Sequence, residues 1–205
     1  MITSAEELLL DVVKSALLGV KIPTNLHGKA GNHIEALLKK LGFPINSRGL
    51  IDIKKRGIKL EVKSRRNDAS SAFTIGSMLK SKIIKISDWY QSPICKKMNK
   101  ILLFTTGGTE LNPDDNTILD ISIYDFKDRP EIQDLLKDSW DNSRQQLMAN
   151  AKNKNFKYCS SDGYIAYFER VPETNSWQFR FNKTRYQSLL RMEKSNFKNI
   201  FEYGV

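Results

Sequence analysis

The sequence predicts a mixed α/β fold of the α+β kind, in which helices flank a mixed β-sheet. Helical and strand periodicities follow one another along the chain, and several strand-like segments pair as hairpins. No internal repeat or low-complexity linker occurs. A chain of 205 residues with 40% hydrophobic and 10% aromatic residues can bury a substantial core. We therefore expect one domain over residues 1–205, with sub-lobes of about 1–125 and 126–205.

Two helices are expected near the N-terminus. Residues 4–18 carry an amphipathic pattern that opens with Ser4 as the cap and Glu7 three residues later. Residues 30–41 place their apolar side chains on one helix face and leave Glu35 at the flank of that face. Glu35 therefore lies either toward a neighbouring element or on a solvated surface.

The later elements are predicted from alternation and from turn residues. Residues 49–66 read as two short strands around an Arg56-Gly57 turn. Pro130 suits the first turn of a long helix. The other expected elements are strands at 82–87, 100–106 and 117–124, a helix at 130–151, a hairpin of 164–170 with 177–181, and a closing helix at 183–192.

The charge balance points to a polyanionic partner. The formal net charge is +10, and the basic residues are spread along the chain rather than gathered in a tail. This favours a folded cleft for nucleic acid over an anionic membrane surface. Cys95 and Cys159 lack CxxC spacing, which argues against structural zinc and a disulfide framework. With neither a secretory signal nor a membrane-spanning run, we expect a cytoplasmic protein that does not contact membranes.

The hairpin of residues 49–66 gathers unlike charges within apolar surroundings. Strand alternation puts Glu61 and Lys63 on one face, and pairing brings Asp52 opposite or diagonal to Glu61. Two carboxylates and the Val62 carbonyl suit Mg²⁺, with Mn²⁺ as a substitute. This set favours phosphodiester hydrolysis, with Lys63 orienting or deprotonating water or stabilising negative charge. The alternative is an ordinary salt-bridged hairpin.

A glutamate on a helix, then an aspartate, then Glu-x-Lys on a hairpin resembles the PD-(D/E)xK nuclease superfamily. The chain is further similar to the MutH-like branch, which includes the mismatch-repair nicking endonuclease MutH and the MvaI and BcnI restriction endonucleases. The matching positions are Gly31 four residues before Glu35, Asp52, Glu61 and Lys63, and the similarity continues through residues 96–103, 131–147, 164–170 and 179–190.

The resemblance implies a restriction-endonuclease-like fold with a catalytic sub-lobe and a C-terminal hairpin-helix lobe that reads DNA. It implies metal ligation by Asp52 and Glu61, catalysis by Lys63, and support from Glu35, which would orient Lys63 or bind a second metal. Lys97 matches a functional lysine of the family. The basic residues expected to contact DNA are Arg65, Arg66, Arg180, Lys183 and Arg185.

The expected activity is Mg²⁺-dependent, sequence-specific cleavage of double-stranded DNA by a type II restriction endonuclease. Arg180 stands where the mismatch-repair enzyme is expected to carry an aromatic sensor of adenine methylation, and arginine donates bidentate hydrogen bonds to guanine. A nicking endonuclease at hemimethylated GATC and a non-catalytic DNA-binding module remain the alternatives. The sequence does not distinguish a monomer from a homodimer.

Three further expectations concern other side chains. Trp89, Trp140 and Trp177 are expected in the core, and both cysteines are expected to be inert. The loop lysines, which are Lys152, Lys154 and Lys157, contact phosphates or belong to a solvated loop.

Overall fold

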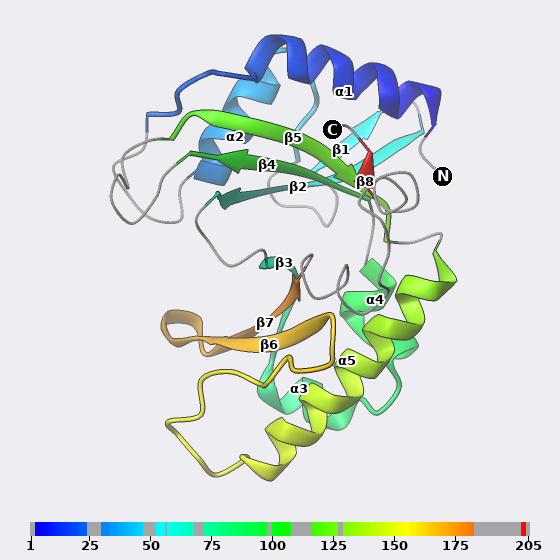
Figure 1. Cartoon of the computed structure of the whole chain (residues 1–205), viewed down its shortest axis with the longest axis vertical. Helices are drawn as coiled ribbons and strands as arrows, with labels where there is room; N and C mark the ends of the chain where they lie inside the picture. Colours follow the sequence, from blue (N-terminus) through cyan, green and yellow to red (C-terminus); the bar gives the residue numbers. More distant parts are fainter. Residues whose placement is uncertain are drawn as a thin grey trace. The chain divides into compact units, whose positions relative to one another are not determined.

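The structure is a computed structural model that describes residues 3–23, 30–46, 52–55, 57–67, 72–97, 100–107, 116–126, 129–182 and 202–203. Two sheets and several helices confirm the mixed α/β class (Figure 1). The chain divides into two compact units. The first unit comprises residues 1–70, 99–128 and 194–205, and the second comprises 71–98 and 129–193.

The first unit is built on a five-stranded mixed sheet with the order β1-β2-β4-β5-β8. β2 and β4 are parallel, and the other neighbouring pairs are antiparallel. The strands are β1 (Ile53–Lys55), β2 (Ile58–Arg66), β4 (Lys100–Thr106), β5 (Ile118–Tyr124) and β8 (Glu202–Tyr203).

Two helices, α1 (Ser4–Leu17) and α2 (Ala30–Lys40), cover one face of this sheet (Figure 1). The core between them includes Leu60 and Val62 of β2, packed with apolar side chains of both helices and of β4 and β5. Because side chains alternate along a strand, the burial of Leu60 and Val62 under the helices turns Glu61 to the opposite face.

The start of α1 differs by one residue from the expectation. Thr3, rather than Ser4, is the N-cap: its hydroxyl accepts a hydrogen bond from the Glu6 N–H at 3.3 Å. The Glu6 carboxylate accepts one from the Thr3 N–H at 2.8 Å, which completes a capping box. Ser4 and Glu7 have the same spacing, but Glu6 lies on the buried face of the helix and Glu7 does not.

The second unit is built on an antiparallel sheet with the order β3-β7-β6. Two 3₁₀ turns, Trp89–Gln91 and Pro172–Thr174, accompany it. The strands are β3 (Ala72–Leu79), β6 (Ala166–Val171) and β7 (Ser176–Asn182), and the helices are α3 (Lys80–Lys85), α4 (Pro93–Lys97) and α5 (Pro130–Ala149).

Aromatic side chains form the core of the second unit, as expected for the tryptophans. Trp89, Trp140 and Trp177 are all buried. The rings of Trp89 and Trp140 lie 5.5 Å apart, and Trp140 meets Phe168 edge-on at 5.4 Å. Offset and edge-to-face contacts of this kind add stability beyond the area they bury.

The strand predicted at residues 82–87 is wrong, because the segment is the helix α3 (Lys80–Lys85). A short apolar run does not distinguish a strand from a helix by periodicity alone. The true strand of this region, β3 (Ala72–Leu79), escapes the pattern because small and polar residues interrupt it. One of them is Gly76, where an added Cβ would lie 2.9 Å from two Ile94 side-chain carbons.

The division of the chain does not coincide with the expected boundary after residue 125. Residues 71–98 belong to the second unit, because β3 pairs along its length with β7. The hairpin of β6 and β7 is confirmed, whereas the closing helix expected at 183–192 lies outside the described residues. Within the part of the chain that the structure describes, no helix is long and apolar enough to cross a membrane.

Candidate active site

The predicted hairpin forms at one edge of the first unit's sheet. β1 and β2 are antiparallel, with Ile53 opposite Leu60 and Lys55 opposite Ile58. Gly57 has a φ of 87°, a conformation that glycine adopts without the Cβ penalty of other residues. The pairing ends at Ile53, so β1 does not continue beside the part of β2 that carries Glu61 and Lys63.

Asp52 occupies this unpaired stretch of the β2 edge. Its Oδ2 accepts a hydrogen bond from the Val62 N–H at 2.7 Å, and its own carbonyl accepts one from the Asn46 N–H at 2.9 Å. Within a strand, the N–H and C=O of one residue point toward the same neighbour. The Val62 carbonyl therefore faces the same edge as the Asp52 carboxylate, which places two oxygen donors together.

Glu61 and Lys63 flank Val62 and share the sheet face opposite the helices. Lys63 Nζ lies 2.5 Å from Glu61 Oε1, and their side chains are 30% and 21% exposed. Partial burial of both charges strengthens their interaction relative to a fully solvated pair. The shared face that alternation predicts for Glu61 and Lys63 is confirmed, and an ordinary salt-bridged hairpin would show the same contact.

Glu35 projects from the helix that covers the other face of the sheet. Gly31 brings the start of α2 close to β2, since a Cβ added there would lie 3.9 Å from Ser64 Oγ. Glu35 is one turn further along the same side of α2 and is half-buried. Among the described residues, Asp52, Glu61 and Glu35 do not gather into a metal-binding group of three acidic, histidine or cysteine side chains.

The donors at the β2 edge fit a hard divalent cation. Asp52, Glu61 and the Val62 carbonyl offer only oxygen ligands, and Asp52 and Val62 are already in contact. Mg²⁺ takes one or two protein carboxylates and keeps several waters, so it does not require a third acidic side chain. The chemistry of this donor set therefore suits Mg²⁺ better than zinc, which favours nitrogen and sulfur.

The expected DNA-binding arginines occupy different environments. Arg65 Nε donates a hydrogen bond to Thr105 Oγ1 at 3.3 Å, across the parallel pairing of β2 with β4. Arg66 is half-buried. Arg180 forms an ion pair with Glu169 and donates to the Ala72 carbonyl at 3.2 Å. Its guanidinium is thus held by the second unit itself.

Three expected site residues have side chains that the structure does not describe. Lys97 ends α4 in the second unit, but the position of its side chain is not described. Lys183 and Arg185 follow the end of β7 and lie wholly outside the described residues. Their predicted roles therefore stay predictions.

A buried charge cluster in the first unit was not anticipated. Lys100 Nζ lies 2.7 Å from Glu6 Oε2 and 4.0 Å from Asp125 Oδ2, and all three side chains are at most 12% exposed. A signal for it exists in the sequence: Glu6 precedes Leu9, Leu10 and Val13 at the helical spacing of the buried face. An acidic residue on that face requires a partner.

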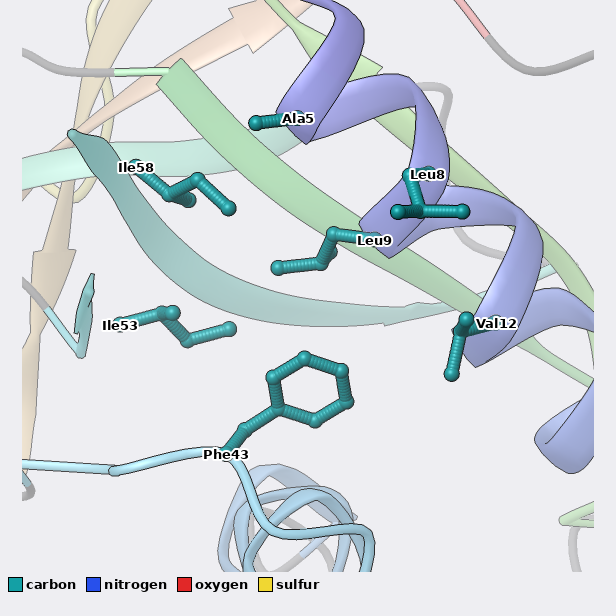
Figure 2. Close-up of a pocket in the computed structure, with 7 residues that line it drawn as sticks. All are labelled: Ala5, Leu8, Leu9, Val12, Phe43, Ile53 and Ile58. Atoms are coloured by element: carbon teal, nitrogen blue, oxygen red, sulfur yellow. The ribbon is translucent and has the colours of Figure 1, made fainter. Parts of the chain in front are cut away.

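An apolar pocket of about 260 Å³ lies elsewhere in the first unit, between α1 and the segments that carry Phe43, Ile53 and Ile58 (Figure 2). The wall on the α1 side consists of Ala5, Leu8, Leu9 and Val12, of which Leu8 and Val12 are exposed. Its lining offers no side chain suited to acid–base or metal chemistry, so the β2 edge remains the candidate active site.

No protein-family model matches this chain, and none of the curated proteins matches it either.

Proposed function

We propose that this chain is a Mg²⁺-dependent, sequence-specific endonuclease that hydrolyses phosphodiester bonds of double-stranded DNA, as a type II restriction endonuclease does. The observation that carries the proposal is the contact of the Asp52 carboxylate with the Val62 backbone. It puts a carboxylate and a carbonyl at one strand edge, with Glu61 and Lys63 on the residues to either side. The proposal includes a restriction-endonuclease-like fold, a C-terminal DNA-reading lobe and action in the cytoplasm.

Each residue at the edge has a definite role in this proposal. Asp52, Glu61 and the Val62 carbonyl would hold the cation. When bound, Mg²⁺ lowers the pKa of water and neutralises phosphate charge. The Lys63 ammonium would hold the attacking water or the phosphate oxygen, both of which accept its hydrogen bonds. Its 2.5 Å contact with Glu61 fixes its position beside the proposed ligands.

The net charge of +10 supports a DNA substrate. Contacts of lysine and arginine with phosphates supply essentially all of the sequence-independent affinity of a protein for DNA. Arg65 is two residues beyond Lys63 on the same strand face, with its Nε anchored to Thr105. An arginine held in this way is suited to a phosphate next to the scissile bond.

The test is a magnesium digest of a mixed-sequence plasmid, followed by sequencing of the DNA ends. The wild type should produce discrete ends, and EDTA should abolish cleavage. Lys63→Met should reduce cleavage by at least about 10²-fold, because an electrostatic group in the reaction contributes on this scale. Lys59→Met is the matched control: Lys59 is an exposed lysine on the same strand and face, and its loss should leave the rate unchanged.

The outcomes separate this proposal from its alternatives. Nicks confined to hemimethylated GATC sites would favour the mismatch-repair activity. Intact DNA that is nevertheless bound would favour a non-catalytic DNA-binding module. Full cleavage by Lys63→Met would remove this site from the reaction.

A further inference from the structure

The loop between α5 and β6 in the second unit presents an exposed basic surface. We define the basic loop as residues 152–158, which include Lys152, Lys154 and Lys157. All three lysines are exposed, and none forms an ion pair with any residue that the structure describes. Three unpaired positive charges within six residues need either water or an anionic partner.

The start of the basic loop is anchored by Lys80. Its Nζ donates hydrogen bonds to the Asn150 and Ala151 carbonyls, each at 3.0 Å. These carbonyls follow the last turn of α5, where backbone acceptors lack helical partners and attract a cation. The same ammonium lies 6.0 Å from the Trp177 ring centroid. The chain is therefore fixed before it reaches Lys152.

The middle and end of the basic loop are fixed to β6 and β7. The Phe156 ring packs against the buried Trp177 ring at 5.8 Å. Arg170 of β6 donates its backbone N–H to the Lys157 carbonyl at 2.7 Å and its Nη1 to the Lys154 carbonyl at 2.8 Å. The lysine side chains thus project from a backbone that is held at several points.

The groups that hold the basic loop add positive charge to it. Burial lowers the pKa of Lys80, and the nearby positive charge of Arg170 lowers it further. Glu169, whose backbone bridges to Tyr158, forms an ion pair with Arg180. Glu169, an acidic side chain that adjoins the basic loop, is therefore already engaged by Arg180. Like charges gathered in this way repel one another, and an anionic partner would relieve the repulsion.

We propose that the basic loop binds the phosphate backbone of duplex DNA, without reading its sequence. The choice of DNA as the polyanion rests on the proposed function. The basic surface itself is argued from the contacts and exposure of the loop, independently of that function. Lysine, asparagine and tyrosine side chains make many of the contacts to phosphate oxygens in protein–DNA complexes, and the basic loop carries all three types. Because its backbone is anchored, little further ordering accompanies binding.

The test is the salt dependence of duplex binding by the full chain in EDTA, where cleavage cannot consume the DNA. For each phosphate that the protein no longer neutralises, the slope of log K against log salt concentration falls in magnitude by about 0.9. We expect the triple variant K152A/K154A/K157A to lose about 2–3 units of slope and to bind about tenfold or more weakly at low salt. The triple arginine variant K152R/K154R/K157R should retain the wild-type slope.

The matched control is K21A/K40A/K85A, which removes the same charge from exposed lysines on other elements. It should change the slope by less than one unit. Equal losses in both alanine variants would refute the proposal, because only overall charge would then matter. An unchanged slope in the loop variant would also refute it. So would a loop variant that binds DNA as the wild type does but has lost binding to phosphatidylserine vesicles.

Failure of this proposal is distinguishable from failure of the nuclease assignment. Cleavage of DNA by the wild type together with an unaffected loop variant would overturn only the basic-loop proposal. If the wild type binds DNA in EDTA but does not cleave it in magnesium, and the loop variant shows the predicted loss of slope, the basic-loop proposal is supported and the endonuclease proposal is refuted.

Discussion

Asp52 has two separable roles in the proposed site, and substitutions can resolve them. Its Oδ2 accepts the Val62 N–H at 2.7 Å, and its charge would help to hold Mg²⁺. Asp52→Ala removes both the acceptor and the charge. Asp52→Asn removes the charge but keeps a carbonyl oxygen of similar shape that accepts the same N–H.

The expected magnitudes follow from that hydrogen bond. A bond to a charged acceptor contributes about 1.5–3 kcal/mol, and an N–H left without an acceptor in a largely buried strand carries a desolvation penalty of about 1–3 kcal/mol. Both figures refer to the loss of one hydrogen bond, so they are not added together. Val62 is only 7% exposed, so little water can replace the lost acceptor. We therefore expect Asp52→Ala to lower the free energy of unfolding by about 2–3 kcal/mol. Asp52→Asn should lower it by about 1 kcal/mol or less.

The assays are urea unfolding and magnesium-dependent DNA cleavage. The unfolding midpoint of Asp52→Ala should fall by about 1 M urea. Both variants should lose cleavage by about 10²-fold or more, since a bound metal contributes several kcal/mol to catalysis. Asp11→Ala and Asp11→Asn, at an exposed helical aspartate, serve as matched controls. Wild-type cleavage by Asp52→Asn would refute metal ligation, and wild-type stability of Asp52→Ala would refute the structural role.

The remaining predictions concern buried groups. Lys100→Met leaves the buried Glu6 and Asp125 carboxylates without this cation, so urea unfolding should show that the free energy of unfolding falls by about 3–5 kcal/mol. Adding Glu6→Gln to this variant should recover part of the lost stability. Strictly additive effects of the two substitutions would contradict the proposed coupling. Burial raises the pKa of Cys159 to about 12, so iodoacetamide at pH 8.5 should alkylate native Cys159 about a thousandfold more slowly than unfolded Cys159, as measured by mass spectrometry. Since this pKa is raised on folding, the stabilising contribution of Cys159 is complete below about pH 8.5–9 and is lost as pH rises toward 12. Cys159→Ala should remove that part of the pH dependence of the free energy of unfolding. An unchanged pH profile of stability in this variant would refute the prediction.

Much of the hairpin was predictable because its signals are local. Alternation set Glu61 and Lys63 on one face, and Gly57 marked the turn. The hydrogen bond from Val62 to Asp52 was not predictable in the same way. It spans ten residues and depends on β1 ending where Asp52 begins, which alternation does not specify.

Arg180 illustrates the limit of sequence interpretation at a position that was expected to contact DNA. Its place on β7 was predicted, but its ion pair with Glu169 depends on the register of β6 against β7, and its bond to Ala72 depends on β3. The strand β3 itself was missed, because small and polar residues obscure its pattern and its partner β7 lies about a hundred residues away. A guanidinium expected to read bases is thus engaged within its own unit.

By itself, the sequence determined the mixed α/β class, the two N-terminal helices, the β1–β2 hairpin and the buried tryptophans. These features follow from backbone sterics and hydrophobic periodicity, which act over a few residues. Only the tertiary structure decided that Asp52 contacts the Val62 backbone, that residues 71–98 join the second unit, and that the basic loop is fixed upon β6. Each of these features depends on contacts between segments that are distant in the chain. Neither the periodicity nor the residue spacing within one segment predicts such contacts.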